Sequence, residues 1–135
     1  MATNCQIWFR YCRIYVKIRK IIYVAFTCQQ AIEKLVKALH VLYTENEAPK
    51  THNILYVFEL IFNNEENSSK VPDKNFKEIR NKYSSLFTRL HSYYIAARYT
   101  DYKRKISESL DKKICAELLK ETKEAFKWLT SLKIL

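Results

Sequence analysis

The stretch Val24–Leu42 reads VAFTCQQAIEKLVKALHVL. Its apolar residues recur at steps of three or four, at Val24, Cys28, Ala31, Leu35, Ala38 and Leu42. Because an α-helix has about 3.6 residues per turn, this spacing places all of these side chains in one stripe along a helix. The pattern predicts an amphipathic helix that packs against other elements along this stripe.

The same spacing recurs outside this stretch, in residues 7–18, 54–61, 76–97 and 118–132. No stretch alternates polar and apolar residues for long enough to predict a strand. Thr51 is predicted to cap the helix that follows it, and the polar residues 63–69 are predicted to form a loop. We therefore expect a single all-α domain over residues 1–135, folded as an antiparallel up-and-down bundle of about five helices.

The sequence contains no glycine, although average usage of about 7% would supply roughly nine residues. The phosphate loop G-x-x-x-x-G-K-[ST], the dinucleotide fingerprint G-x-G-x-x-G and the G-x-S-x-G nucleophile elbow all need glycine. None of these motifs is therefore present. A bound nucleotide would have to be held by side chains on helices, chiefly those of lysine, arginine and tyrosine.

The chain has 24 Lys and Arg residues against 14 Asp and Glu residues, for a formal net charge of +10. Such a charge favours anionic partners, including nucleic acids. The longest apolar run, residues 21–26, is far shorter than the ~20 residues of a membrane span, and no secretion signal is recognisable. The four cysteines form no C-x-x-C pair. We expect a cytoplasmic protein without a membrane span, metal or cofactor, whose thiols are reduced and mostly buried.

Three blocks of sequence carry a family resemblance: Gln29–Leu39 (QQAIEKLVKAL), Pro49–Ile54 (PKTHNI) and Tyr93–Tyr102 (YYIAARYTDY). In this order and spacing they resemble the HEPN family of small α-helical proteins. The block Lys120–Leu129 (KETKEAFKWL) is similar to the last helix of that family. The resemblance covers roughly residues 23–132.

The resemblance implies a compact helical bundle that usually forms a homodimer. Members of the family are often encoded beside a minimal nucleotidyltransferase, in two-component systems of the toxin–antitoxin kind. The family is named for proposed nucleotide binding, and many members are ribonucleases. Those ribonucleases carry an arginine, then four to six residues of any kind, then a histidine.

This chain departs from the ribonuclease motif. The matching region begins at Arg98, and the fifth residue after it is Lys103 where a histidine would be needed. Metal-independent RNA cleavage requires a base and an acid, and histidine is the side chain that titrates closest to neutral pH. Unperturbed side chains such as those of Lys103 and Tyr102 lose a proton only near pH ~10, which makes them poor bases. We therefore expect binding rather than catalysis.

The candidate residues for nucleotide or RNA binding are Lys34, Lys37, His52, Arg98, Tyr99, Tyr102 and Lys103. Lys34 and Lys37 share a helix face, which is either a phosphate-contacting stripe or a solvated one. Glu33 is placed to pair with Lys37 at i,i+4. His52 either belongs to the site or is a packed or capping residue of its loop.

Arg98 and Asp101 also have two interpretations. They form either an internal ion pair at the end of a helix or part of a polar cluster between subunits. In the second case Arg98 and Lys103 bind phosphate while a tyrosine stacks on a base. If the protein is a ribonuclease, the candidate catalytic residues are Arg98, Asp101, Tyr102 and Lys103.

Residues 1–22 are the least family-like part of the chain. Four basic residues are spaced to share one helix face there, at Arg10, Arg13, Lys17 and Lys20. This segment is a packed helix with a solvated basic face, a nucleic-acid contact or an attachment to a membrane surface.

Two functions follow from the sequence. The first is a homodimeric binding and interaction protein that binds nucleotide or RNA and partners a minimal nucleotidyltransferase. The second is a divergent, metal-independent ribonuclease toxin. A purely structural dimer without a ligand is a third interpretation, and it predicts an apolar, self-complementary face.

Overall fold

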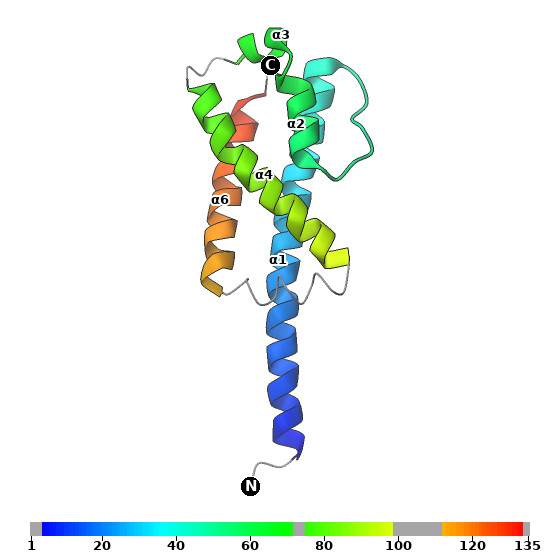
Figure 1. Cartoon of the computed structure of the whole chain (residues 1–135), viewed down its shortest axis with the longest axis vertical. Coiled ribbons are helices and arrows are strands. Elements are labelled where there is room, and N and C mark those ends of the chain that lie inside the picture. The colour runs from blue at the N-terminus through cyan, green and yellow to red at the C-terminus, as the bar shows by residue number, and fades with distance from the viewer. Residues whose placement is uncertain (1–3, 72–74, 99–111, 134–135) are drawn as a thin grey trace.

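The computed structural model describes residues 4–71, 75–98 and 112–133. Its helices are α1 (Asn4–Thr44), α2 (Ile54–Phe62), α3 (Glu65–Ser69), α4 (Phe76–Arg98) and α6 (Lys112–Ser131). No strand occurs among these residues. In Figure 1, α4 runs against the direction of α1 and α6, and α2 lies beside the C-terminal half of α1. The predicted all-α bundle is confirmed.

The first helix is longer than the sequence pattern suggested. The stripes at residues 7–18 and 24–42 were expected to mark separate segments, but both lie on α1, which is 41 residues long. Neither proline nor glycine occurs within residues 4–44, so no residue there breaks the helix. At 1.5 Å per residue α1 is about 60 Å long. Its N-terminal part extends beyond the other helices (Figure 1).

The core lies between the C-terminal half of α1 and the helices α2, α4 and α6. The stripes predicted within α2, α4 and α6 contribute these buried residues to the core: Ile54, Phe58, Ile61, Phe76, Tyr83, Leu86, Phe87, Leu90, Leu118, Thr122, Ala125, Leu129 and Leu132. Aromatic rings fill the end near α3: Phe58 lies 4.7 Å from Phe62, and Phe62 lies 5.1 Å from Phe76. The hydroxyl of Tyr43 donates a hydrogen bond to the carbonyl of Leu132, which ties α1 to the end of α6.

The buried face of α1 differs from the predicted stripe. Ile32, Val36 and Leu39 are fully buried, whereas Ala38 and Leu42 of that stripe are exposed. α1 packs against α2 and α4 as well as α6, so its buried face is centred between these neighbours. The predicted stripe lies at one edge of that face, on the side of α6.

Two local expectations are wrong. Asn53, not Thr51, is the N-cap of α2, because the Asn53 side chain accepts a hydrogen bond from the backbone N–H of Tyr56. Thr51 instead accepts a hydrogen bond from the backbone N–H of Asn53. The polar stretch 63–69 contains the short helix α3, whose N-cap is Asn64.

Glu45 ends α1 in a left-handed backbone conformation, with φ of 57°. Its N–H donates to the carbonyl of Val41 at 2.8 Å, as the C′ residue of a helix does in an αL cap. Glycine is usual at this position because a Cβ atom is strained there. We expect Glu45→Gly to raise the free energy of unfolding by about 1 kcal/mol in urea unfolding.

Glu47→Gly is the matched control for this prediction. Glu47 is an exposed glutamate two residues later that does not share the positive φ. Glycine there adds freedom to the unfolded chain without relieving strain, so stability should stay unchanged or fall by less than about 1 kcal/mol. Equal effects of the two substitutions would contradict this explanation.

Candidate functional site

A buried carboxylate on α1 is the centre of the candidate site. Glu33 is only 5% exposed, and its two oxygens accept hydrogen bonds from three side chains. Lys37 Nζ lies 2.8 Å from Oε1, and Gln29 Nε2 lies 2.7 Å from Oε2. Residues 29, 33 and 37 are each four apart, so one face of α1 presents all three. The Glu33–Lys37 pair predicted from this spacing is confirmed.

His52 completes the group from the segment between α1 and α2. Its Nδ1 lies 2.9 Å from Oε1 of Glu33, and its backbone carbonyl accepts a hydrogen bond from Gln29 Nε2 at 3.3 Å. Its ring stacks on Tyr94 of α4, with 4.4 Å between the ring centroids. We call Gln29, Glu33, Lys37, His52 and Tyr94 the His52 cluster. It joins α1, the α1–α2 connection and α4.

The two sides of the His52 ring differ in environment. Tyr94 is buried and supports the ring, and Phe26 stacks on Tyr94 in turn at 6.0 Å. The His52 side chain as a whole is 47% exposed, whereas that of Glu33 is 7% exposed. Because a carboxylate only accepts hydrogen bonds, Nδ1 of His52 carries a proton and donates it to Glu33. The cluster therefore presents a fixed, half-exposed imidazole to solvent.

The charge on Glu33 is stabilised by its neighbours. Burial raises the pKa of the carboxyl group, but hydrogen bonds from Lys37 and Gln29, together with the charges of Lys37 and His52, outweigh that effect. The pKa of Glu33 consequently lies below its ordinary value, and the group is ionised at neutral pH. Glu33 thus holds His52 and Lys37 as a charged acceptor.

This lowered pKa predicts a pH dependence of stability. The ionised Glu33 stabilises the folded state at every pH above the ordinary glutamate pKa of about 4.3, and this contribution is lost as the pH falls through the lower folded pKa. In urea unfolding, the difference in free energy between wild type and Glu33→Gln should therefore be greater at about pH 7 than at about pH 3. Glu47→Gln, which alters an exposed glutamate, should follow the wild type at both.

The structure unites only some of the predicted site residues. Lys37 and His52 meet at Glu33, and Lys34 is exposed on the next face of α1. Arg98 is the last residue of α4, one helical turn beyond Tyr94. Tyr99, Asp101, Tyr102 and Lys103 lie outside the described residues, as does the proposed Arg98–Asp101 pair.

Sequence reasoning missed three members of the cluster as site residues: Gln29, Glu33 and Tyr94. Of these, Gln29 and Glu33 left a signal, because their spacing with Lys37 is four residues and Glu33 is the first acidic residue of the chain. Tyr94 sits in a predicted core stripe and gave no separate signal.

No three His, Cys, Asp or Glu side chains of the described residues are grouped so that they could hold a metal ion. Cys28 and Cys115 are both buried. None of the helices in the described part of the chain has the length and apolar character of a membrane span.

A family model described as the HEPN domain matches residues 11–133. The match covers most of the chain and begins within the segment that looked least family-like. This protein therefore belongs to the HEPN domain family. Neither the comparison with curated proteins nor the comparison with solved structures found a match.

Proposed function

We propose that this HEPN domain is a binding and interaction module that binds nucleotide or RNA at the His52 cluster. The observation that carries the proposal is the half-exposed His52 ring, supported by Tyr94 and held by the ionised Glu33. An aromatic ring fixed in this way offers a face on which a base can stack. Lys34 is exposed nearby on α1 and is available to a phosphate group.

We further propose that the protein forms a homodimer and associates with a minimal nucleotidyltransferase in a two-component, toxin–antitoxin-like system. Membership of the HEPN family is the support for this part. Light scattering should give the mass of a dimer. The purified protein should also form a complex with a minimal nucleotidyltransferase encoded beside its gene. A monomer that forms no such complex would overturn this part of the proposal.

Fluorescence anisotropy with labelled single-stranded RNA, ATP and GTP tests the binding. Phosphate contacts release counterions, so RNA affinity should fall steeply between about 50 and 200 mM salt. The slope of log affinity against log salt gives the number of phosphates contacted, at about 0.7 per contact for single strands. The absence of binding to all three probes at about 50 mM salt would overturn the proposal, and a salt-independent affinity would exclude the phosphate contacts.

One observation favours RNA cleavage as a second candidate function. His52 Nδ1 is bound to a buried carboxylate, an arrangement that fixes the tautomer of a general base and leaves Nε2 to accept a proton. His52 would then supply the imidazole that the ribonuclease motif requires and that is missing after Arg98. Arg98, Asp101, Tyr102 and Lys103 would remain the other candidate catalytic residues.

Incubation of the RNA with the protein and EDTA separates the two functions. The binding module leaves the RNA intact. Cleavage that is lost in both His52→Ala and Arg98→Ala, but kept in Lys70→Ala on the exposed end of α3, would establish the ribonuclease instead.

A further inference from the structure

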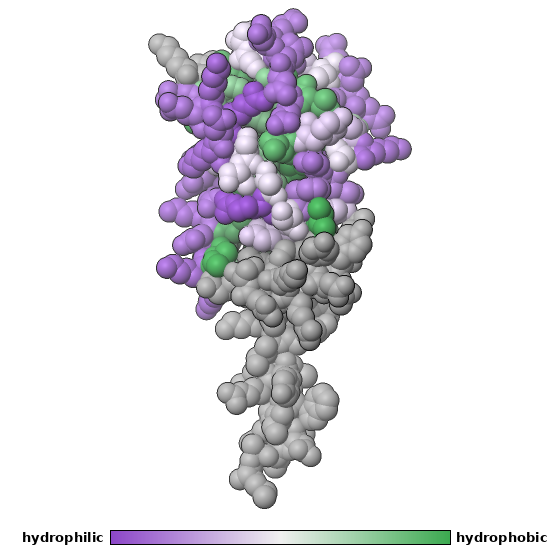
Figure 2. All heavy atoms as spheres, in the orientation of Figure 1, coloured by the Kyte–Doolittle hydropathy of each residue, from purple (hydrophilic) through white to green (hydrophobic). Residues whose placement is uncertain are grey.

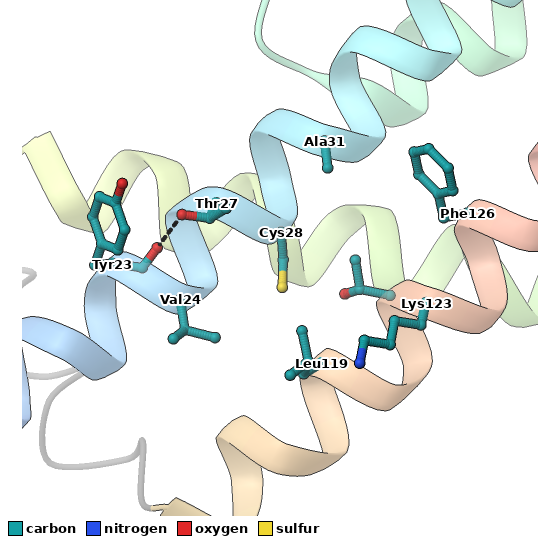
Figure 3. Close-up of a pocket in the computed structure, with 9 residues that line it drawn as sticks. Tyr23, Val24, Thr27, Cys28, Ala31, Leu119, Lys123 and Phe126 are labelled. Atoms are coloured by element: carbon teal, nitrogen blue, oxygen red, sulfur yellow. Dashed lines mark hydrogen bonds between the residues drawn. The ribbon is translucent and has the colours of Figure 1, made fainter.

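A groove of about 420 Å³ runs between α1 and α6. Val24, Cys28 and Ala31 of α1 point toward Leu119 and Lys123 of α6 across it, as Figure 3 shows. Val24, Cys28 and Ala31 are the first three residues of the apolar stripe that was predicted from the sequence to pack against other elements. Its volume is within the range of about 300–1,000 Å³ that is typical of ligand pockets.

The groove exists because α1 presents small side chains where α6 approaches. Ala31 and Thr27 do not fill the space beside Leu119 and Phe126, which remain 40% and 44% exposed. Tyr23 is 68% exposed at one end of the groove. Large apolar side chains that gather at the rim of a groove are typical of an interaction site.

The exposed side of α6 carries both basic and acidic residues. Lys120 and Lys127 lie one turn on either side of Lys123, and all three are exposed. Glu117, Glu121 and Glu124 of this helix lie farther round from the groove than Lys123, and Glu124 is one turn from Lys120. Glu121 is paired with Arg89 of α4, at 2.5 Å. Lys123 is therefore the basic residue on the α6 side of the groove, while the floor is apolar.

The groove lies away from the His52 cluster. Ala31 and Glu33 are two residues apart on α1, so their side chains leave the helix about 200° apart. A partner in the groove would leave the imidazole of His52 uncovered.

We propose that the α1–α6 groove docks an acidic amphipathic helix of a partner protein. Leu119 and Phe126 are two helical turns apart, which matches the i, i+3/i+4, i+7 spacing of apolar side chains on a docked helix. Acidic residues beside that apolar face would meet Lys123, and the exposed Lys120 and Lys127 lie one turn from it. A docked helix would cover the exposed side chains at the rim. A small-molecule ligand is usually enclosed over most of its surface, which this open groove does not allow.

A second copy of this chain fits the groove poorly. The net charge of +10 and Lys123 beside the groove would bring like charges together when the same face meets itself. This groove also differs from an enclosed apolar site, since Tyr23, Leu119 and Phe126 are all partly exposed.

The probe is a fluorescein-labelled helical peptide of about 18 residues, with leucine on one face and glutamate on the others. We expect it to bind the full chain in anisotropy measurements at about 50 mM salt, with the dissociation constant raised about tenfold or more by Phe126→Ala or by Lys123→Glu. A peptide with lysine in place of glutamate should prefer Lys123→Glu over wild type. Circular dichroism confirms that each variant is folded.

Lys77→Glu is the matched control, because it makes the same charge change at an exposed position of α4. It should leave peptide binding within about twofold of wild type. Absence of binding, or equal weakening by Lys77→Glu and Lys123→Glu, would overturn the proposal. A dimer that Phe126→Ala converts to a monomer would assign the groove to a second copy, and binding to anionic vesicles that Phe126→Ala abolishes would assign it to lipid. Either result would also overturn the proposal.

Discussion

Phe58→Ala is expected to lower the free energy of unfolding by about 3–5 kcal/mol. Phe58 is fully buried, and its ring lies 5.4 Å from that of Phe87 and 5.9 Å from that of Trp128. Removing it opens a cavity between α2, α4 and α6, which these large rings cannot collapse to fill. The loss is a large part of the 5–15 kcal/mol that is typical of a domain, and urea unfolding measures it.

Tyr56→Ala provides the control from the same helix. Tyr56 is also aromatic, but it is 49% exposed and outside the core. Its replacement should change the free energy of unfolding by about 0.5 kcal/mol or less. Similar losses for the two variants would mean that α2 contributes through its helix alone and not through the aromatic core.

His52→Ala is expected to lower the affinity for single-stranded RNA by about tenfold. Alanine substitution of a residue that stacks on a base typically removes about 1–3 kcal/mol, and tenfold corresponds to about 1.4 kcal/mol. The ring is held by Glu33 and Tyr94 before RNA arrives, so little ordering is needed when a base stacks on it. Anisotropy titrations at a fixed salt concentration measure the effect.

Two other variants separate stacking from charge. His52→Phe keeps an aromatic face and should retain more affinity than His52→Ala. Lys70→Ala removes a positive charge at the exposed end of α3 and should cause only a small loss. If His52→Phe binds as weakly as His52→Ala, base stacking at this position is contradicted, and a role for the imidazole nitrogens is favoured.

Periodicity predicted the helices better than their surroundings. The stripes of α2, α4 and α6 are the buried faces of those helices, because each of these helices packs against the core along one side. For α1 the same rule selected the wrong centre, since Ile32 and Val36 lie beneath neighbours on several sides while Ala38 is exposed. Which face of a central helix is most buried depends on the arrangement of its partners, and local spacing does not contain that information.

The candidate site shows the same limit. Local spacing predicted the Glu33–Lys37 pair, because four residues make one turn of a helix. His52 reaches Glu33 from 19 residues away and rests on Tyr94 from a third element. Such contacts arise from the packing of helices and the path of a loop. The residues from Tyr99 to Lys103 lie outside the described structure, so their part in the site stays a prediction.

The left-handed residue Glu45 has a consequence for the unfolded chain. Glycine widens the range of conformations that an unfolded chain can explore. Each replacement of glycine at a compatible site narrows that range and thereby stabilises the folded state by about 0.4–1 kcal/mol. A sequence without glycine therefore loses less conformational entropy when it folds. Among the described residues, Glu45 is where this gain is offset by strain in the folded state. Avoidance of glycine thus makes the unfolded ensemble of this small domain more restricted, and part of its stability arises there.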